Sequence, residues 1–300
     1  MCRIFGFRSS VPSRAHRSLV EAENALATQS LRHPDGWGIG YVTGDDAYVV
    51  KSGRAAHDSD RFARTCARLE SHTFVVHVRK ATVGAIEPVN AHPFRFGRWL
   101  FAHNGTIYGF EEYREWFLDR IEADLQAQVM GDTDSEHLFF VLLSALRRAG
   151  IDRSTSASSD AAVVGRILRE ELLALDRFAL DRNLDRPLLN VLLTDGRTFV
   201  AHRAGMPLFL STQKWHCPDA ATCPAADKVC LLARRPADHP VNHLLVASEP
   251  IGRAENRWEE IIDGTTIVCD AQFRLAPIGP PNGWVAPVLP EWARAASSAR

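Results

Sequence analysis

The sequence has no long apolar stretch and no excess of charge of either sign. Its apolar runs are short, as in residues 188–193, far below the ~20 residues that a membrane-spanning helix needs. The 35 basic and 36 acidic residues leave a formal net charge of −1, and the arginines are spread along the chain. Neither nucleic acid nor a membrane is therefore indicated as a partner.

A secretory signal and a disulfide or zinc-knuckle pattern are also missing. Polar Arg8 and Ser9 follow soon after the start, where a signal peptide would be apolar. The six cysteines form no C-x-x-C pair, and a chain of 300 residues can bury a core without disulfides. We expect a soluble, cytoplasmic protein, in which thiols are more often catalytic or metal-binding than paired.

Strand-like and helix-like patterns occur in separate blocks. Apolar and β-branched runs predict strands and periodic segments predict helices. The expected strands lie at 4–7, 37–50, 74–78, 99–102, 188–193, 198–203, 208–211, 244–247 and 266–269, and the expected helices at 58–70, 111–128, 134–148 and 161–177, with a polar loop at 153–160. This order favours a layered α+β fold over a doubly wound parallel sheet.

One domain accounts for most of the chain. No internal repeat divides residues 2–275, whereas residues 276–300 are rich in Pro and Gly near their start. We expect a single domain over 2–275 and a surface tail over 276–300.

Cys2 is the first residue with chemical interest. Removal of the initiator Met1 would leave a residue that carries a thiol and a free α-amine on one carbon. The amine has an ordinary pKa of about 7.7–8.0, so a neutral fraction can take up the thiol proton near neutral pH. By position alone such a cysteine need not be catalytic, and other residues must support the assignment.

Supporting residues lie in a set of short motifs. Gly and polar residues follow or precede apolar runs in each of them, as expected where strands and helices begin or end. The motifs are HVRKATVG at 77–84, NAHPF at 90–94, AHNGTI at 102–107 and GDTDSE at 131–136, together with Met1-Cys2-Arg3 and RHPDGWGI at 32–39.

This set, in this order, resembles the class II glutamine amidotransferases, a branch of the N-terminal nucleophile hydrolases. The resemblance covers roughly residues 2–275 and implies a four-layer αββα sandwich of antiparallel sheets. The DGWG segment is similar to that of the short, stand-alone subgroup that includes γ-glutamyl hydrolases. The resemblance implies a substrate that is glutamine or a γ-glutamyl small molecule, and no cofactor.

The resemblance also implies a role for five residues. Cys2 corresponds to the nucleophile, and Asn104 and Gly105 to the donors for the oxyanion. Arg79 and Asp134 correspond to the residues that bind the substrate α-carboxylate and α-ammonium. The residue types fit these tasks, since a guanidinium forks onto a carboxylate and a buried carboxylate balances an ammonium. No metal site is expected.

Some features depart from the synthase-linked members of the family. These usually read HTRWATHG, where this chain has Lys80 and Val83, and we expect no second catalytic domain after residue 275. Hydrolysis of a γ-amide by the chain alone is therefore the first hypothesis. A glutaminase subunit that delivers ammonia to a separate synthase subunit, and a non-catalytic binding protein, are the alternatives.

Simpler interpretations remain for the binding residues. Arg79 could form a structural ion pair, Asn104-Gly105 could be a hairpin turn, and Asp134 could cap the helix near Ser135. Asp132 is a second candidate for the ammonium.

Histidines and further cysteines offer two other chemistries. One of His77, His92 and His103 could pair with a cysteine as a general base. Cys217, Cys223 and Cys230, with histidines nearby, could bind a metal, but their spacing favours ordinary thiols in a loop.

Overall fold

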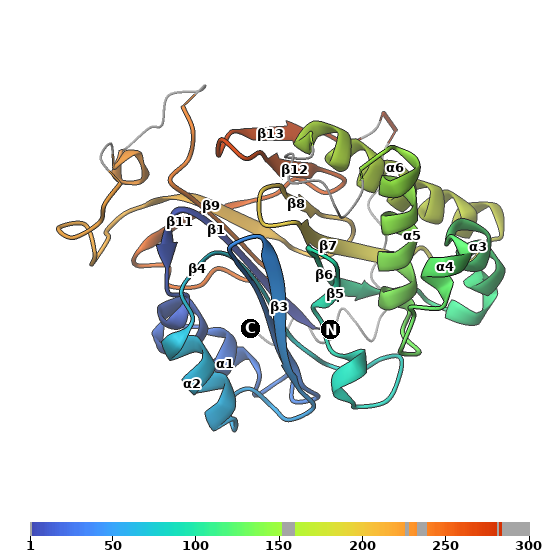
Figure 1. The fold of residues 1–300 in the computed structure, drawn as a ribbon, viewed down its shortest axis with the longest axis horizontal. Coiled ribbons are helices and arrows are strands. Elements are labelled where there is room, and N and C mark those ends of the chain that lie inside the picture. The colour runs from blue at the N-terminus through green and yellow to red at the C-terminus, as the bar shows by residue number, and fades with distance from the viewer. Residues whose placement is uncertain (1, 152–159, 226–227, 233–238, 281, 284–300) are drawn as a thin grey trace.

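Two β-sheets stacked face to face form the centre of the molecule, and helices cover their outer faces (Figure 1). The structure is a computed structural model that describes residues 2–151, 160–225, 228–232, 239–280 and 282–283. The predicted loop at 153–160, except for Asp160, and residues 284–300 of the predicted tail lie outside this part of the chain.

The first sheet carries the N-terminal strand at its centre. Its strands are antiparallel and follow the order β11-β9-β10-β1-β4-β2-β3. In register, Phe5 of β1 lies opposite Val76 of β4 and Ala247 of β10. The bounds are β1 Arg3–Ser13, β2 Trp37–Thr43, β3 Asp46–Ser52, β4 Ser71–Val78, β9 Phe209–Lys214, β10 His243–Ala247 and β11 Asn256–Glu260.

The second sheet carries the strand that contains Asn104. It is also antiparallel, in the order β13-β12-β8-β7-β6-β5, and Asn104 of β6 lies opposite Asn190 of β7. The bounds are β5 Phe94–Phe96, β6 Trp99–Thr106, β7 Leu188–Thr194, β8 Phe199–His202, β12 Thr266–Cys269 and β13 Leu275–Ile278. β13 thus crosses the predicted boundary between domain and tail.

Each sheet has its own helical layer. The first sheet is covered by η1 (Arg17–Glu21), α1 (Leu26–Gln29) and α2 (Asp60–Arg68), and the second by η3 (Phe110–Tyr113), α3 (Arg114–Arg120), α4 (Ala123–Gln126), α5 (Asp134–Arg148) and α6 (Ala161–Asp181). Short 3-10 turns, η2 (Pro88–Asn90) and η4 (Val229–Leu231), lie in connections.

Alternation along the strands produces this layering. In β1, Ile4 packs between the sheets while Phe5 packs under the helices of the first sheet. In β6, Ala102 packs between the sheets while Phe101 packs under the helices of the second. Since side chains alternate in a strand, each sheet buries both faces. The predicted α+β, four-layer αββα sandwich is confirmed.

The prediction of one continuous helix at 111–128 is wrong. It consists of η3, α3 and α4, interrupted at Ile121, which has an extended backbone (φ −86°, ψ 125°). Ile121 is buried in the helix-side core, and the N–H of Glu122 donates to Ser144 Oγ of α5 at 3.0 Å. Packing on α5 therefore overrides the local periodicity.

The expected segment at 37–50 is two strands instead of one. Gly44 (φ 60°) lies in the turn between β2 and β3. The short strands β5, β11 and β13 were not predicted, because three to five residues carry little periodic signal. Within the described residues, no helix is both long and apolar enough to span a membrane.

Buried histidines make stability depend on pH. Burial lowers the pKa of His202 and of His243 from 6.5 to about 3. Above pH 6.5 these histidines are neutral in both states, but below it the unfolded chain binds protons that the folded chain does not.

We therefore expect the free energy of unfolding to fall as pH drops from 6.5 toward 3. Each such histidine should contribute a loss of about 2 kcal/mol at pH 5. The free energy of unfolding can be measured by urea denaturation between pH 8 and pH 5. Plotted against pH, it should have a shallower slope for His202→Gln than for the unsubstituted protein. The exposed His216→Gln is the control, and an equal change of slope in both variants would contradict the assignment.

Candidate active site

The sulfur of Cys2 lies against the backbone of Lys80. Cys2 Sγ accepts a hydrogen bond from the Lys80 N–H at 3.2 Å and donates to the Lys80 carbonyl at 3.3 Å. Lys80 is the second residue after the end of β4, the neighbour of β1 in the sheet. The first strand and the HVRKATVG motif are therefore in contact at the thiol.

The DGWG segment fixes the backbone that Cys2 contacts. The Arg79 N–H donates to the Gly36 carbonyl at 2.8 Å, and the Asp35 N–H donates to the Arg79 carbonyl at 3.0 Å. The Asp35 carboxylate accepts the Ala81 N–H at 2.9 Å. Both sides of Lys80 are thus held, so the peptide groups at the thiol have a defined orientation.

The thiol is not acidified by its surroundings. Burial raises the pKa of Cys2 above its ordinary value, although the Lys80 backbone hydrogen bond and the charges of Arg79 and Arg3 act in the opposite direction. A thiol with a raised pKa needs a base to become a nucleophile.

Asn104 faces the space between the sheets, beside the start of β1. Its Nδ2 donates to Ser248 Oγ at 3.0 Å, and the same Oγ accepts the N–H of Ile4 at 3.0 Å. Ile4 is two residues from Cys2. The Asn104 side chain is buried, and its Oδ1 has no hydrogen-bond partner in the described part of the chain.

Gly105 lies inside β6, opposite Leu189 of β7. The hairpin-turn interpretation of Asn104-Gly105 is therefore wrong, because β6 continues to Thr106. A Cβ at Gly105 would lie 1.7 Å from the Leu188 carbonyl oxygen and 2.4 Å from His103 Nε2. Only glycine fits this position.

Arg79 is buried, and its guanidinium contacts backbone carbonyls. Nη1 donates to the Ala85 carbonyl at 2.7 Å, and Nη2 donates to those of Val83 at 2.8 Å and Gly84 at 3.3 Å. In this structure Arg79 braces the turn that follows β4 and forms no ion pair among the described residues. A substrate carboxylate would have to share the guanidinium with this turn or replace some of these contacts.

Asp134 is the first residue of α5, and its carboxylate is hydrogen-bonded. Oδ2 accepts the Ile107 N–H at 2.9 Å, and Oδ1 accepts the Ser135 N–H at 2.8 Å and the Ser135 hydroxyl at 3.1 Å. The helix cap is Thr133, not Asp134, since Thr133 Oγ1 accepts the Glu136 N–H at 3.3 Å. A carboxylate has about four acceptor positions, which leaves capacity for an ammonium.

None of the three candidate histidines bonds to Cys2. His103 Nδ1 contacts Ser135 Oγ and Nε2 contacts the Leu188 carbonyl, both at 2.8 Å. The rings of His77 and His92 are tilted at 41° with centroids 4.3 Å apart, and among the described residues their nitrogens have no partner. Burial lowers the pKa of both rings well below 6.5, so they are neutral at physiological pH. This geometry does not support a Cys–His pair.

The turn after β4 and the start of α5 meet at a hollow of about 400 Å³. Val83 and Gly84 line one side, and Gly131 and Asp132 line another. Asp132, the second candidate for the ammonium, lies on the wall of this cavity, whereas Arg79 and Asp134 do not line it.

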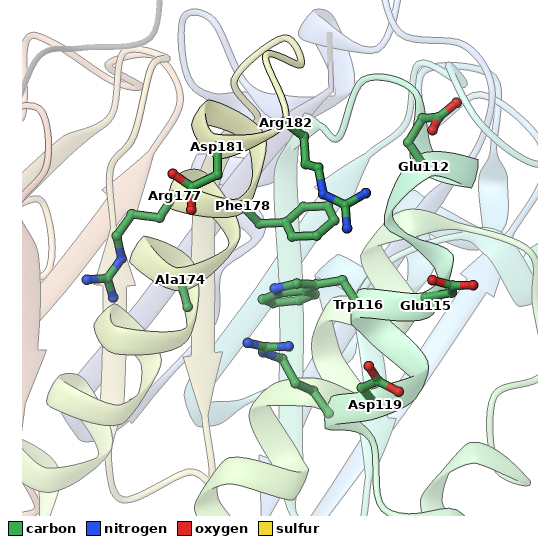
Figure 2. A pocket seen from close by; sticks show the side chains of 10 residues that line it. Glu112, Glu115, Trp116, Asp119, Ala174, Arg177, Phe178, Asp181 and Arg182 are labelled. Atoms are coloured by element: carbon green, nitrogen blue, oxygen red, sulfur yellow. The ribbon is translucent and has the colours of Figure 1, made fainter.

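A second hollow, of about 500 Å³, lies between α3 and α6, away from all the candidate residues (Figure 2). Arg120 stacks over the Trp116 ring at 4.2 Å, and Arg182 stacks over the Phe178 ring at 4.9 Å. These cations already occupy the aromatic faces, and the hollow contains none of the predicted chemistry.

The cysteine-bearing stretch shows free thiols. Cys217, Cys223 and Cys230 are unpaired, and Lys214 Nζ lies 3.7 Å from Cys217 Sγ. Within the residues that the structure describes, no group of three or more His, Cys, Asp or Glu side chains could hold a metal ion.

A sequence model of the family described as "Glutamine amidotransferases class-II" matches residues 1–275. The chain belongs to the class II glutamine amidotransferases.

Relatives and solved structures agree with this membership. A probable glutamine amidotransferase, DUG3, of Saccharomyces cerevisiae is 24% identical over 92% of this chain and 83% of its own length. A γ-glutamyl-hercynylcysteine sulfoxide hydrolase of Mycobacterium tuberculosis is 37% identical over 26% of this chain and 34% of its own. A glutamine aminotransferase class-II domain protein from Silicibacter pomeroyi has the same fold, with a TM-score of 0.59 and 19% identity over 92% of this chain and 98% of its own.

Sequence reasoning missed three residues that hold the site of this amidotransferase together. Asp35 supports the Lys80 backbone, Ser248 joins Asn104 to β1, and Glu249 accepts hydrogen bonds from Arg3. The position of Asp35 in the DGWG segment was a usable signal. Ser248 and Glu249 carry none, because they follow a strand with no motif around them.

Asp134→Asn tests the structural role of this carboxylate. One end of the amide would present hydrogens to the N–H of Ile107 or Ser135, so we expect a loss of about 1–3 kcal/mol in unfolding free energy. Urea denaturation measures it. Asp132→Asn, at an exposed position, is the matched control and should change stability by less than about 0.5 kcal/mol. Equal losses would show that the Asp134 contacts are not special.

Proposed function

We propose that this class II glutamine amidotransferase hydrolyses the γ-amide of glutamine or of a γ-glutamyl compound through a thioester on Cys2. The observation that carries the proposal is the approach of Asn104 to the first strand. The Asn104 amide and the Ile4 N–H both contact Ser248 Oγ, and Ile4 is only two residues from Cys2. In the proposed reaction Cys2, the nucleophile, and Asn104, the oxyanion donor, act on the same γ-carbonyl group of the substrate.

The α-amine of Cys2, free once Met1 is removed, is the base in this proposal. The raised pKa of the thiol makes such a base necessary, and none of the candidate histidines bonds to the sulfur. The amine takes the thiol proton as the sulfur attacks the γ-carbonyl, and then gives that proton to the leaving amine. Water hydrolyses the resulting γ-glutamyl thioester to glutamate and free thiol.

Asn104 and Gly105 stabilise the negative charge that develops on the carbonyl oxygen. Two N–H donors in a buried site are an effective pair for this purpose, because they need little reorganisation during the reaction. Arg79 and Asp134 bind the α-carboxylate and α-ammonium of the glutamyl half, and Arg79 gives up part of its contact with the carbonyls of residues 83–85 to do so.

The processed N-terminus is the first test of the mechanism. Protein that begins at Cys2 should release glutamate from at least one member of a panel of γ-glutamyl amides that includes glutamine. Retained Met1 or an N-terminal tag should abolish turnover without changing the thermal unfolding temperature, since the amine would then be an amide or lie in the wrong place. Mass spectrometry verifies the terminus, and glutamate release measures activity.

Cys2→Ala should be inactive in the same assay, whereas Cys223→Ala, another half-buried free cysteine, should retain full activity. A fully active tagged protein would contradict the role of the amine. If activity appears only when a separate synthase is added, the chain is a glutaminase subunit. Inactivity on every compound, with or without a synthase, would favour a binding protein.

Asn104→Ala tests the oxyanion donor. Removal of one such donor typically lowers kcat by 10²–10³, and we expect that loss with KM changed much less. Steady-state kinetics on the best substrate of the panel gives both constants. A loss confined to KM would mean that Asn104 binds the substrate but does not stabilise the oxyanion.

A further inference from the structure

Ser248 occupies a junction between the two sheets. It follows β10 directly and is buried. Two backbone-linked contacts tie it to β1: the Ser248 N–H donates to the Ile4 carbonyl at 3.1 Å, and the Ile4 N–H donates to Ser248 Oγ at 3.0 Å. The contact from Asn104 Nδ2 to the same Oγ comes from the opposite sheet. Ser248 therefore links the strand of the nucleophile to the strand of the oxyanion donor.

Ser248 is itself held from the other side by its neighbour Glu249. The Glu249 carboxylate accepts hydrogen bonds from Arg3 and from Asn24 Nδ2, and it pairs with Arg32 at 3.7 Å. Burial raises the pKa of Glu249, but the charge of Arg3 and the other contacts outweigh it, so the pKa is lowered and the group stays ionised. This ion cluster gives the backbone at 248–249 a fixed position.

The hydrogen bonds at this junction are incompletely satisfied. Asn104 Oδ1 is buried without a partner, and the hydroxyl of Ser248 accepts two hydrogen bonds but donates none among the described residues. A buried acceptor and a buried donor are thus both unused, although they belong to side chains in contact. Such groups cost free energy when they are left unpaired.

A half-turn of the Asn104 amide about its Cβ–Cγ bond would pair the unused acceptor, Asn104 Oδ1, with the unused donor, the Ser248 hydroxyl. Oδ1 would then accept the Ser248 hydroxyl proton, and Ser248 Oγ would still accept the Ile4 N–H. Nδ2 would lie where Oδ1 lies now, with its hydrogens unused. This torsion is broad and roughly two-fold in asparagine, so the turn needs no backbone movement.

The orientation of the amide decides whether it can bind an oxyanion. An oxygen at this position repels the developing negative charge, whereas a nitrogen donates a hydrogen bond to it. An asparagine without a directing partner would divide its population between the two orientations. A hydroxyl that donates to Oδ1 selects the productive one.

We propose that Ser248 is a positioning residue for catalysis: its hydroxyl donates to Asn104 Oδ1 and so turns Nδ2 toward the reacting carbonyl. This inference rests on the proposed function, in which Cys2 attacks and Asn104 binds the oxyanion. Ser248 touches neither the substrate nor the reacting atoms and acts through Asn104.

A double-mutant cycle on kcat tests the proposal. Ser248→Ala should lower kcat by roughly 10–100-fold, less than the 10²–10³-fold loss of an oxyanion donor, with KM changed less than about threefold. Ser248→Thr keeps the hydroxyl and should stay within about threefold of the unsubstituted protein. In the Asn104→Ala background, Ser248→Ala should change kcat by less than about twofold, because no amide remains to be oriented.

A buried serine elsewhere in the same sheet provides the control. Ser211 of β9 is 1% exposed against 6% for Ser248, and within the described residues its hydroxyl bonds only to the Gln213 carbonyl, at 3.0 Å. Ser211→Ala should leave kcat unchanged. Thermal unfolding shows whether each variant is folded, and Ser248→Cys, with a weak donor of similar volume, carries the test if the alanine variant does not fold.

Two results would overturn the proposal. One is an equal fractional loss of kcat from Ser248→Ala with and without Asn104, which would make Ser248 a structural residue only. The other is unchanged kcat in folded Ser248→Ala or Ser248→Cys. Failure of the proposed function looks different, because Cys2→Ala or Asn104→Ala would then retain activity whatever happens at Ser248.

Discussion

The central position of β1 between β4 and β10 is the constraint on which the rest of the site depends. Because β1 pairs on both sides, its first residues cannot move without breaking contacts with two neighbouring strands. The β4 side brings the Lys80 backbone to the Cys2 sulfur, and the β10 side brings Ser248 to the Ile4 N–H. The residues that follow Cys2 are thus held in the middle of a sheet.

This position also shapes the chemistry of the thiol. Burial raises the pKa of Cys2, while the nearby Arg3 and Arg79 oppose that effect without overcoming it. Neighbouring groups therefore leave the thiol protonated in the resting protein. In the proposed mechanism a base on the same carbon supplies what the environment does not. In the same proposal Asn104, in contact with Ser248, stabilises the oxyanion.

The sequence predicted best the structure of segments with a long periodic apolar pattern, and the family from several short motifs in a fixed order. The helix predicted at 134–148 has those bounds in the structure, since its apolar stripe is sustained over four turns. The layered α+β class and the family followed from the order of blocks and motifs. The break at Ile121 was not predictable, because it depends on Ser144 of another helix.

In the candidate site, too, the sequence predicted some residues and not others. It predicted the residues of the motifs, but not the partners that orient them. The sequence predicted that Arg79 binds the substrate α-carboxylate. In the structure its guanidinium donates hydrogen bonds to the carbonyls of residues 83–85. Ser248 lies 144 positions from Asn104 in the chain, and the stacking of the two sheets, which carry β10 and β6, brings the two together. Contacts of this kind depend on tertiary register, which local patterns do not specify.

The most direct test of the central claim is a crystal structure of the processed protein with an aldehyde analogue of glutamine bound. The account predicts a hemithioacetal on Cys2 Sγ, with its oxygen roughly 2.7–3.1 Å from both Asn104 Nδ2 and the Gly105 N–H nitrogen. An adduct whose oxygen points away from both donors, or an aldehyde that leaves Cys2 unmodified, would contradict it.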